Sequence, residues 1–330
     1  MATSALRGLD RPDGRLTIGI DLPLDTDLVS GRPPGVPNLA RHAELATLAD
    51  RLGFAALWVR DVPLYDPVRF GDAGTVFETF THLGHLAATT TRAVLGTAAV
   101  VLPLRNPLLA AKAAATVDVL SGGRFVFGIA SGDRPIEYPL FDVDYAQRGA
   151  AFRAAVDTVR AAWRVPAPGE GITAPALGLH ADQALDVLPK PVDTSIPLVV
   201  AGKAQQSLEW IAEHAEGWFN YPRDLAGLAG QLRQWHDLTD ALGARKPYLM
   251  PMMLDLTDSP ATPPSPIFHG LRLGRTALLD HLGTLDDHGV SHLSLSLRCG
   301  RRPVDEVLHE LAETVLPSFP RAEEQQFSEV

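Results

Sequence analysis

One turn in the sequence combines residue types that could bind a phosphate group. Residues 201–207 read AGKAQQS and follow an apolar segment that is expected to form a buried strand. Gly202 permits a tight connection and Lys203 supplies a positive charge. A helix beginning at Ala204 would add backbone N–H groups, which attract anions at a helix start. The alternative is an ordinary turn in which Lys203 is a solvated surface charge.

Other polar side chains also follow segments that we expect to be strands. In chain order they are Asp21, Arg60, Asp61, Arg105, Asn106, Ser131, Asp133, Gly202, Lys203, Gln205, Gln206, Asn220, Tyr221, Arg223, Asp255 and Arg298. None of them forms a nucleophile triad. The serine of GIASG, residues 128–132, is displaced by one position from the G-x-S-x-G pattern, which disfavours acyl hydrolysis.

Strand-like and helix-like segments alternate along the whole chain. The expected strands are residues 16–22, 55–59, 93–101, 124–130, 196–201, 217–220, 248–254 and 292–297. The expected helices are residues 39–52, 75–88, 108–120, 145–163, 204–215, 224–242, 275–288 and 304–315. Eight such units predict a (β/α)8 TIM barrel, with a doubly wound sheet as the alternative. In a barrel the chemistry lies at the carboxyl ends of the strands, where the polar residues above are found.

Two stretches interrupt this alternation. Residues 165–195 are rich in proline and glycine and are interpreted as an inserted hairpin excursion. Residues 257–273 are dense in proline and predict a mobile flap with little helix or strand. The loop at residues 61–73 is long enough to be functional. We expect a single domain over residues 1–330, with flexible tails at 1–14 and 319–330.

Composition narrows the possible partners. A net charge of -10 and the lack of a basic cluster argue against a nucleic-acid surface. One cysteine, Cys299, no signal peptide and no long apolar span predict a cytoplasmic protein that does not enter a membrane. His82 and His85 have no further ligands at metal-site spacing, so no metal is expected.

Three blocks of sequence resemble a known family. LGTAAVVLPLRNP begins at Leu95, SGGRFVFGIASG at Ser121 and IPLVVAGKAQQSLEWIAEHAEGW at Ile196. In this order they resemble the bacterial luciferase-like superfamily of flavin-dependent oxidoreductases. Members are (β/α)8 barrels that bind reduced FMN, or in one branch a reduced deazaflavin, at the carboxyl ends of the strands.

The resemblance implies where the cofactor would bind. It places a cis peptide bond between Ala98 and Ala99 at the seat of the flavin ring. It places the phosphate at Ser131 and at the turn that begins with Gly202. Lys203 would replace the arginine found in the family. Backbone amides at the helix start near Gln205 and Gln206 would complete the phosphate site. Asn106 and Tyr221, at two further strand ends, are additional candidates for cofactor contact.

The catalytic residues are less well defined by the resemblance. The luciferase histidine position is Val62 here, so light emission is not expected. Arg60 and Asp61 are the nearest polar substitutes, or they form a structural salt bridge at the rim. Deazaflavin enzymes often have a Gly-Glu pair after the fourth strand, and Asp133 is a shorter acidic counterpart.

The resemblance favours a two-component monooxygenase. Reduced FMN from a separate flavin reductase would react with O₂ and oxygenate a small organic substrate. His269, Arg272 and Tyr65 lie on loops that could cover the site, and their side chains could face the substrate. Alternatives are a deazaflavin-dependent reductase or dehydrogenase and a flavin-binding barrel without turnover. A homodimer through residues 75–88 and 108–120 is expected, because these helices are rich in small residues and luciferase-like proteins pair through them.

Overall fold

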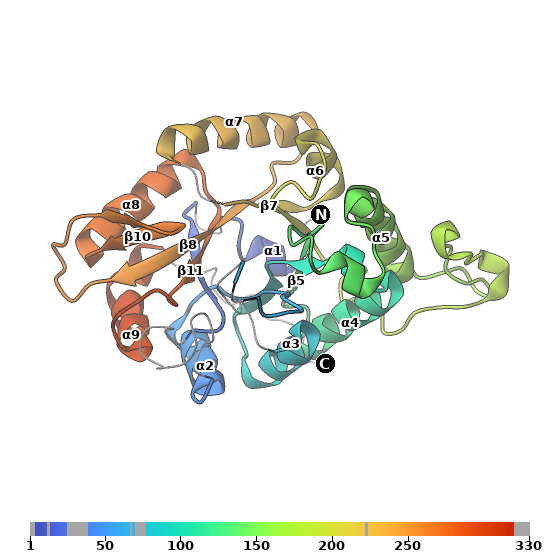
Figure 1. Cartoon of the computed structure of the whole chain (residues 1–330), viewed down its shortest axis with the longest axis horizontal. Coiled ribbons are helices and arrows are strands. Elements are labelled where there is room, and N and C mark those ends of the chain that lie inside the picture. Colours follow the sequence, from blue (N-terminus) through green and yellow to red (C-terminus); the bar gives the residue numbers. More distant parts are fainter. Residues whose placement is uncertain are drawn as a thin grey trace.

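The chain folds as a closed barrel of parallel strands. The computed structural model describes residues 4–11, 14–24, 39–66, 68–69, 77–221 and 224–319. In these ranges helices surround eight barrel strands (Figure 1), which confirms the predicted (β/α)8 fold. The barrel is closed by β11 (His292–Ser296), which pairs in parallel with β8 (Tyr248–Leu256) and β1 (Thr17–Asp21). The intervening strands are β2 (Ala56–Val59), β3 (Val94–Thr97), which β4 (Val100–Val101) continues as one barrel strand, β5 (Phe125–Ala130), β6 (Leu198–Ala201) and β7 (Gly217–Phe219).

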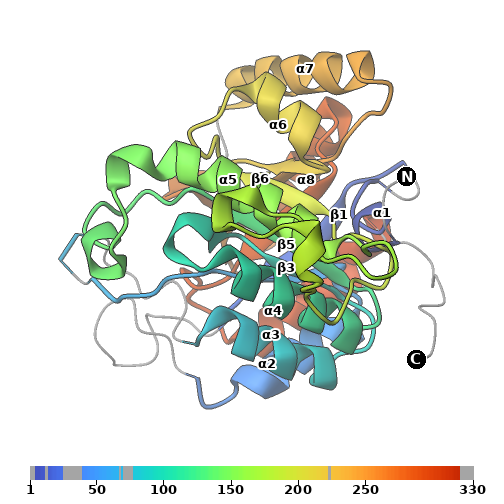
Figure 2. The same cartoon turned by 90° about the vertical axis from the view of Figure 1, so that its right-hand side faces the viewer.

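The helices cover the outside of the barrel. They are α2 (His42–Leu52), α3 (Thr79–Thr89), α4 (Pro107–Leu120), α5 (Arg148–Trp163), α6 (Leu208–His214), α7 (Leu225–Ala241), α8 (Arg275–His288) and α9 (Val304–Thr314). Short 3-10 helices lie at Leu102–Leu104, Tyr138–Phe141, Tyr145–Gln147, Pro175–Leu177, Ala181–Gln183 and Leu316–Ser318. Helices α2, α3 and α4 lie side by side on one flank (Figure 2).

The helix that follows the expected phosphate-binding turn begins later in the chain than predicted. Helix α6 begins at Leu208 and not at Ala204. Ala204 and Gln205 have left-handed backbone conformations, with φ of 45° and 60°, which a right-handed helix cannot include. The predicted start of α3 at residues 75 and 76 lies outside the described residues.

The amino-terminal end of the barrel is closed by the first residues of the chain. Helix α1 (Ser4–Arg7) and the turn after it bury Ala5, Leu6 and Leu9 against barrel residues such as Val94. The expectation that residues 1–14 form a flexible tail is therefore wrong for this segment, because its apolar side chains fill the barrel floor. Residues 320–330 of the other predicted tail lie outside the described residues.

A neutral histidine lies inside the barrel above this floor. Burial lowers the pKa of His292 to about 3, so its ring is uncharged at neutral pH. Trp58 Nε1 donates to His292 Nε2 at 2.9 Å, so the ring proton is on Nδ1 and points to Thr17 Oγ1, 2.8 Å away. The lower barrel is thus filled and hydrogen-bonded, which leaves the carboxyl end for chemistry.

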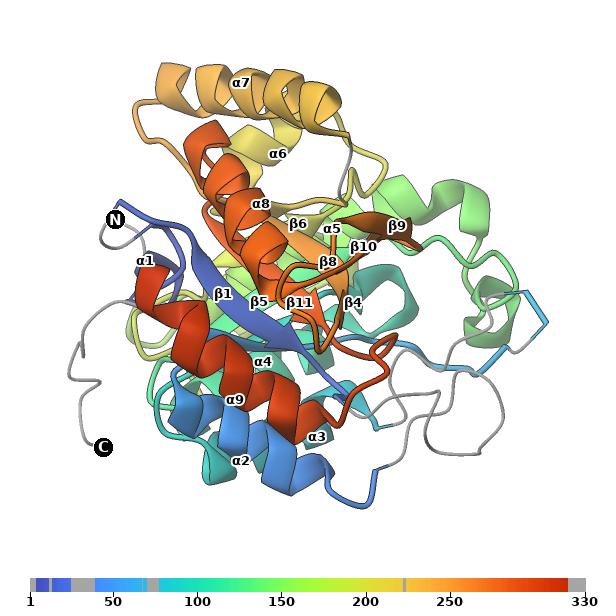
Figure 3. The ribbon, with the colours of Figure 1, turned by 90° about the vertical axis from the view of Figure 1, so that its left-hand side faces the viewer.

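The two irregular stretches have structures that the sequence did not indicate. Residues 165–195 project from the barrel beside α5 (Figures 1 and 2) with two 3-10 helices and one bridge between Ala174 and Leu179, so the expected hairpin strands are wrong. The predicted flap contains β9 (Ser265–Ile267) and β10 (Gly270–Leu273), so its expected lack of strands is also wrong. Strand β10 pairs in parallel with β8, and this hairpin lies at the opposite end of the barrel from α1 (Figure 3).

Candidate functional site

Small side chains line one arc of the rim at the carboxyl ends of the strands. Ala98 and Ala201 pack against the cluster inside the barrel, and both remain partly exposed. Gly128 pairs with Val199, an interior residue, so alternation along β5 also turns Ala130 inward. The arc from β3 to β6 therefore presents short side chains that solvent reaches. The peptide bond between Ala98 and Ala99 is cis, as the resemblance implies, and it separates β3 from β4.

The turn after β6 is fixed in place by its neighbours. Gly202 donates its N–H to the Phe219 carbonyl at 2.8 Å and accepts from Trp218 Nε1 at 2.6 Å. The Gln206 side chain donates to the carbonyls of Gly149 at 2.9 Å and Ala204 at 3.0 Å. Gln206 therefore holds the turn against the start of α5.

The same turn offers donors to a ligand. In the described part of the chain, no hydrogen bond involves the backbone N–H groups of Lys203, Ala204 and Gln205. The side chains of Lys203 and Gln205 are exposed. Successive N–H groups in a left-handed turn form an anion-binding concavity, and a lysine adds positive charge. The donors come from this turn and not from the helix start expected at Ala204.

Ser131 lies on the neighbouring strand end. Strand β5 pairs with β6, which places Ser131 on the same arc as the Gly202 turn. Its carbonyl accepts from the Tyr138 hydroxyl, and the residue is buried. Gly132 has φ of 78°, and a Cβ there would lie 2.5 Å from the Tyr138 hydroxyl oxygen. The loop after β5 is therefore folded tightly over the strand end.

Asp61 is committed to structural contacts. Arg105 donates to both of its carboxylate oxygens, at 2.9 Å and 2.7 Å. Thr79 Oγ1 and the Val101 N–H complete its partners at 2.9 Å and 3.2 Å. Arg105 also pairs with Glu78 at 3.0 Å. These contacts favour the alternative in which Asp61 forms a structural salt bridge. They connect the end of β2 to α3 and β4.

The Asp61→Asn variant is expected to unfold more easily, by about 1–3 kcal/mol, because an amide cannot accept the paired donation from Arg105. Chemical denaturation measures this loss. The matched control is Asp66→Asn, which removes an exposed ion pair with Arg69 and should change stability little. If Asp61→Asn were as stable as the native protein but had lost turnover, Asp61 would instead be a catalytic residue.

Other predicted site residues are distributed around the rim. Arg60 Nε lies 3.9 Å from an Asp21 carboxylate oxygen. Asn106 is exposed and caps α4, with its side-chain oxygen 3.0 Å from the Leu108 nitrogen. Asp133 is exposed. Arg223 lies outside the described residues.

The β8 and β11 ends carry further charged residues. Asp255 is buried and pairs with Arg272 at 3.0 Å and Arg301 at 3.5 Å. Arg298 is buried after β11. These contacts join the β9–β10 hairpin to the loop after β11, so Arg272 is held by an ion pair beside the rim.

Glu137 is an acidic residue that the sequence analysis missed. It lies in the loop after β5 with only 4% of its surface exposed. Its Oε1 makes no hydrogen bond, and the nearest cation is Arg134 at 3.9 Å. Burial raises the pKa of this carboxyl, and the neighbouring Asp133 and Asp61 raise it further against the opposing effect of Arg134. A lone carboxylate inside the apolar run IEYPLF was the available signal.

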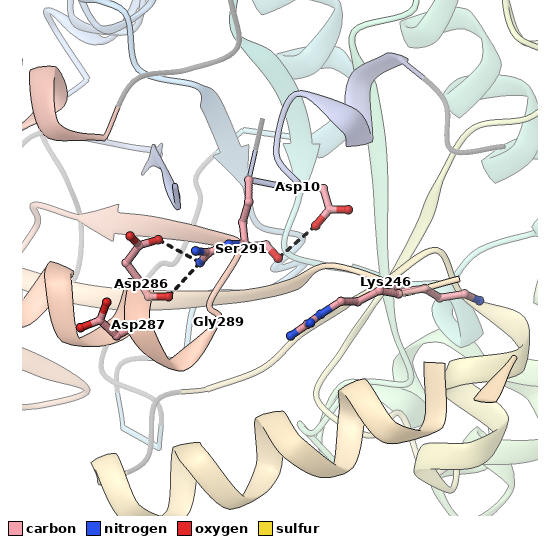
Figure 4. Close-up of a pocket in the computed structure, with 8 residues that line it drawn as sticks. Asp10, Lys246, Asp286, Asp287, Gly289 and Ser291 are labelled. Atoms are coloured by element: carbon pink, nitrogen blue, oxygen red, sulfur yellow. Dashed lines mark hydrogen bonds and ion pairs between the residues drawn. The ribbon is translucent and has the colours of Figure 1, made fainter. Parts of the chain in front are cut away.

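The polar cavity shown in Figure 4 lies at the wrong end of the barrel for this chemistry. It has a volume of about 450 Å³ and lies where β8 and β11 begin. Its charges are largely paired within the protein, with Arg11 bound to Asp286 at 2.9 Å and Lys246 bound to two carbonyls of the α6 end. We therefore assign it a structural role.

The described residues hold no group of three or more His, Cys, Asp and Glu side chains suited to a metal ion. His82 instead contacts His42, with their Nε2 atoms 2.6 Å apart. Burial lowers the pKa of His82 to about 3 and that of His42 to about 4.

Among the helices that the structure describes, none has the length and apolar character needed to cross a membrane.

The closed (β/α)8 barrel thus places a turn with three N–H groups that make no hydrogen bond in the described structure beside an arc of small residues. Residues 20–251 match the profile of luciferase-like monooxygenases. The chain therefore belongs to the luciferase-like monooxygenase family.

The relatives and solved structures that resemble this chain include proteins named for coenzyme F420 and a monooxygenase. A Mycobacterium tuberculosis protein named as a coenzyme F420-dependent oxidoreductase is 27% identical over 235 residues, which are 66% of this chain and 60% of that protein. A monooxygenase structure from Streptomyces bottropensis has a TM-score of 0.71 at 19% identity, covering 92% of this chain and all of that chain. A coenzyme F420-dependent tetrahydromethanopterin reductase from Methanopyrus kandleri has a TM-score of 0.69 at 15% identity, covering 92% and 99%.

Proposed function

We propose that this protein is a two-component monooxygenase that uses reduced FMN and O₂ to oxygenate a small organic substrate. The observation that supports this most is the Ala98, Ala130 and Ala201 arc beside a turn with three uncommitted N–H groups and Lys203. A planar ring fits against small side chains, and its phosphate tail fits against N–H donors and a cation.

Each part of the site then has a role in binding. Lys203 and the N–H groups of residues 203–205 hold the phosphate, and Gln206 keeps the turn against α5. Ser131, at the adjoining strand end, borders the same phosphate position. The bound FMN supplies the redox chemistry with O₂, while the protein orients the reactants and excludes water.

The proton chemistry requires a residue whose carboxyl is not already paired. Asp61 is occupied by Arg105, and Asp133 is exposed to water. Glu137 is buried in the loop that follows β5, its Oε1 makes no hydrogen bond, and its pKa is raised. We assign it the transfer of a proton at its carboxyl oxygen during turnover.

A deazaflavin-dependent reductase or dehydrogenase is the second candidate. It is favoured by the relative named for coenzyme F420. The two functions differ in their use of oxygen. With a flavin reductase, FMN and a substrate panel, the monooxygenase consumes O₂ and NADH when substrate is added, and the deazaflavin enzyme does not. Flavin binding without substrate-stimulated consumption of either would favour a binding protein without turnover.

The Lys203→Ala variant is expected to bind FMN about 5- to 100-fold more weakly, because a hydrogen bond to a charged group contributes roughly 1–3 kcal/mol. Fluorescence titration of FMN gives the affinity. Arg233→Ala removes an exposed cation from α7 and is the control. Equal FMN affinity in both variants and the native protein would return Lys203 to the role of a surface charge.

The assembly is also part of the proposal. Helices α3 and α4 lie side by side and carry many small residues, which suits close packing against a second copy. We expect a homodimer formed through these helices, with a flavin reductase as a separate partner.

A further inference from the structure

Three aromatic rings come together on the part of the rim next to the small-residue arc. Tyr221 follows β7, while Phe268 and His269 form the tip between β9 and β10. The His269 ring lies 5.6 Å from the Tyr221 ring and 4.1 Å from the Phe268 ring, measured between centroids. We call these three residues the aromatic cluster.

The backbone holds the aromatic cluster at a fixed position. The Met253 N–H donates to the His269 carbonyl at 3.0 Å, and Gly270 pairs with Met253 in the β8–β10 ladder. A Cβ at Gly270 would lie 1.8 Å from the Met253 carbonyl oxygen, so only glycine permits this approach. The tip of the hairpin is therefore attached to a barrel strand.

The cluster exposes apolar surface at this fixed position. Phe268 is 72% exposed and Tyr221 is 58% exposed. Exposed aromatic faces that are already held together can bind a ring with little loss of side-chain entropy. Exposed apolar groups gathered beside a functional site commonly mark a ligand-binding surface.

The aromatic cluster adjoins the small-residue arc along the rim, because β7 pairs with β6. The small-residue arc extends from β3 to β6, whereas the aromatic cluster belongs to β7, β8 and the hairpin. We propose that the aromatic cluster is the substrate subsite and that it binds the planar aromatic ring of the substrate by stacking. This inference rests on the proposed function, because it assumes that the cofactor occupies the small-residue arc.

The test compares two bicyclic alcohols with the same carbon skeleton, one planar and aromatic and the other saturated. The protein is titrated with beta-naphthol and with its saturated counterpart decahydronaphthol, each in the presence and absence of FMN. The native protein is expected to bind beta-naphthol about 3- to 10-fold more tightly, as ring stacking would give. Equal binding of the two probes would overturn the inference.

Two variants complete the test. Phe268→Ala, at an exposed position where folding should be unaffected, is expected to lose the preference for beta-naphthol and to keep its FMN affinity. Leu242→Ala removes an exposed apolar side chain at the opposite end of the barrel and should retain the preference. Equal weakening of FMN and beta-naphthol by Phe268→Ala would place the cluster in the cofactor seat and overturn the inference. Failure of the native protein to bind FMN would count against the proposed function, whereas the probe preference reports on the cluster separately.

Discussion

Replacing Ala201 with leucine is expected to weaken FMN binding by about 10- to 100-fold, because the added side chain would occupy the space above the small-residue arc. A 10- to 100-fold loss is about 1.4–2.8 kcal/mol, which lies within the roughly 1–3 kcal/mol that overpacking of a well-fitted site costs. Ala201 packs on the interior cluster yet is partly exposed, so the larger side chain would extend into the mouth and not into the core.

The control for this variant keeps the volume of the side chain. Ala201→Ser should bind FMN nearly as well as the native protein, and thermal unfolding should show that both variants are folded. If leucine and serine leave the FMN affinity equally unchanged, the flavin does not lie over Ala201 and the arc is not its seat.

Glu137→Gln is expected to lower turnover by about 100-fold or more, the usual contribution of a positioned acid or base, while leaving FMN affinity nearly unchanged. The native pH profile should report the same group. A carboxyl that donates a proton acts in its protonated form, so activity should fall as pH rises through a pKa above the ordinary value of 4.5. The variant should lose this limb of the profile.

The stability of Glu137→Gln distinguishes a catalytic role from a structural one. Because the folded-state pKa is raised, the stability associated with the protonated carboxyl is fully present below the unfolded-state pKa and is lost as pH rises through the folded-state pKa. Glutamine cannot ionise, so the variant should be at least as stable as the native protein at pH 8. The control is Asp133→Asn, whose exposed side chain should affect turnover less. A destabilised Glu137→Gln with normal turnover per folded molecule would contradict the assignment.

Much of the barrel could be predicted because its strands are unbroken apolar runs. The apolar run from 93 to 101 predicted one strand, and the structure divides it at Ala98 and Ala99. The β9–β10 hairpin was not predicted, because its pairing depends on the distant Met253 and on a glycine that allows close approach. The burial of Leu6 was missed for a similar reason, since it packs against strands far along the chain.

The sequence predicted where the candidate site residues lie, but not which partners their side chains contact. Strand ends located the Gly202 turn and Ser131 on one arc, because neighbouring parallel strands end at the same rim. The partners of Asp61 could not be derived, since Arg105 is 44 residues away and the pairing depends on the fold. Glu137 was overlooked because burial, which raises its pKa, is a property of the folded loop.

The most direct measurement is a side-by-side titration of the purified protein with FMN, reduced FMN and the deazaflavin. Our account predicts saturable binding that is tightest for reduced FMN and is weakened in Ala201→Leu. Tighter binding of the deazaflavin would replace the monooxygenase proposal with the second candidate. Failure of all three cofactors to bind would contradict the central claim that the rim between β3 and β6 seats a flavin.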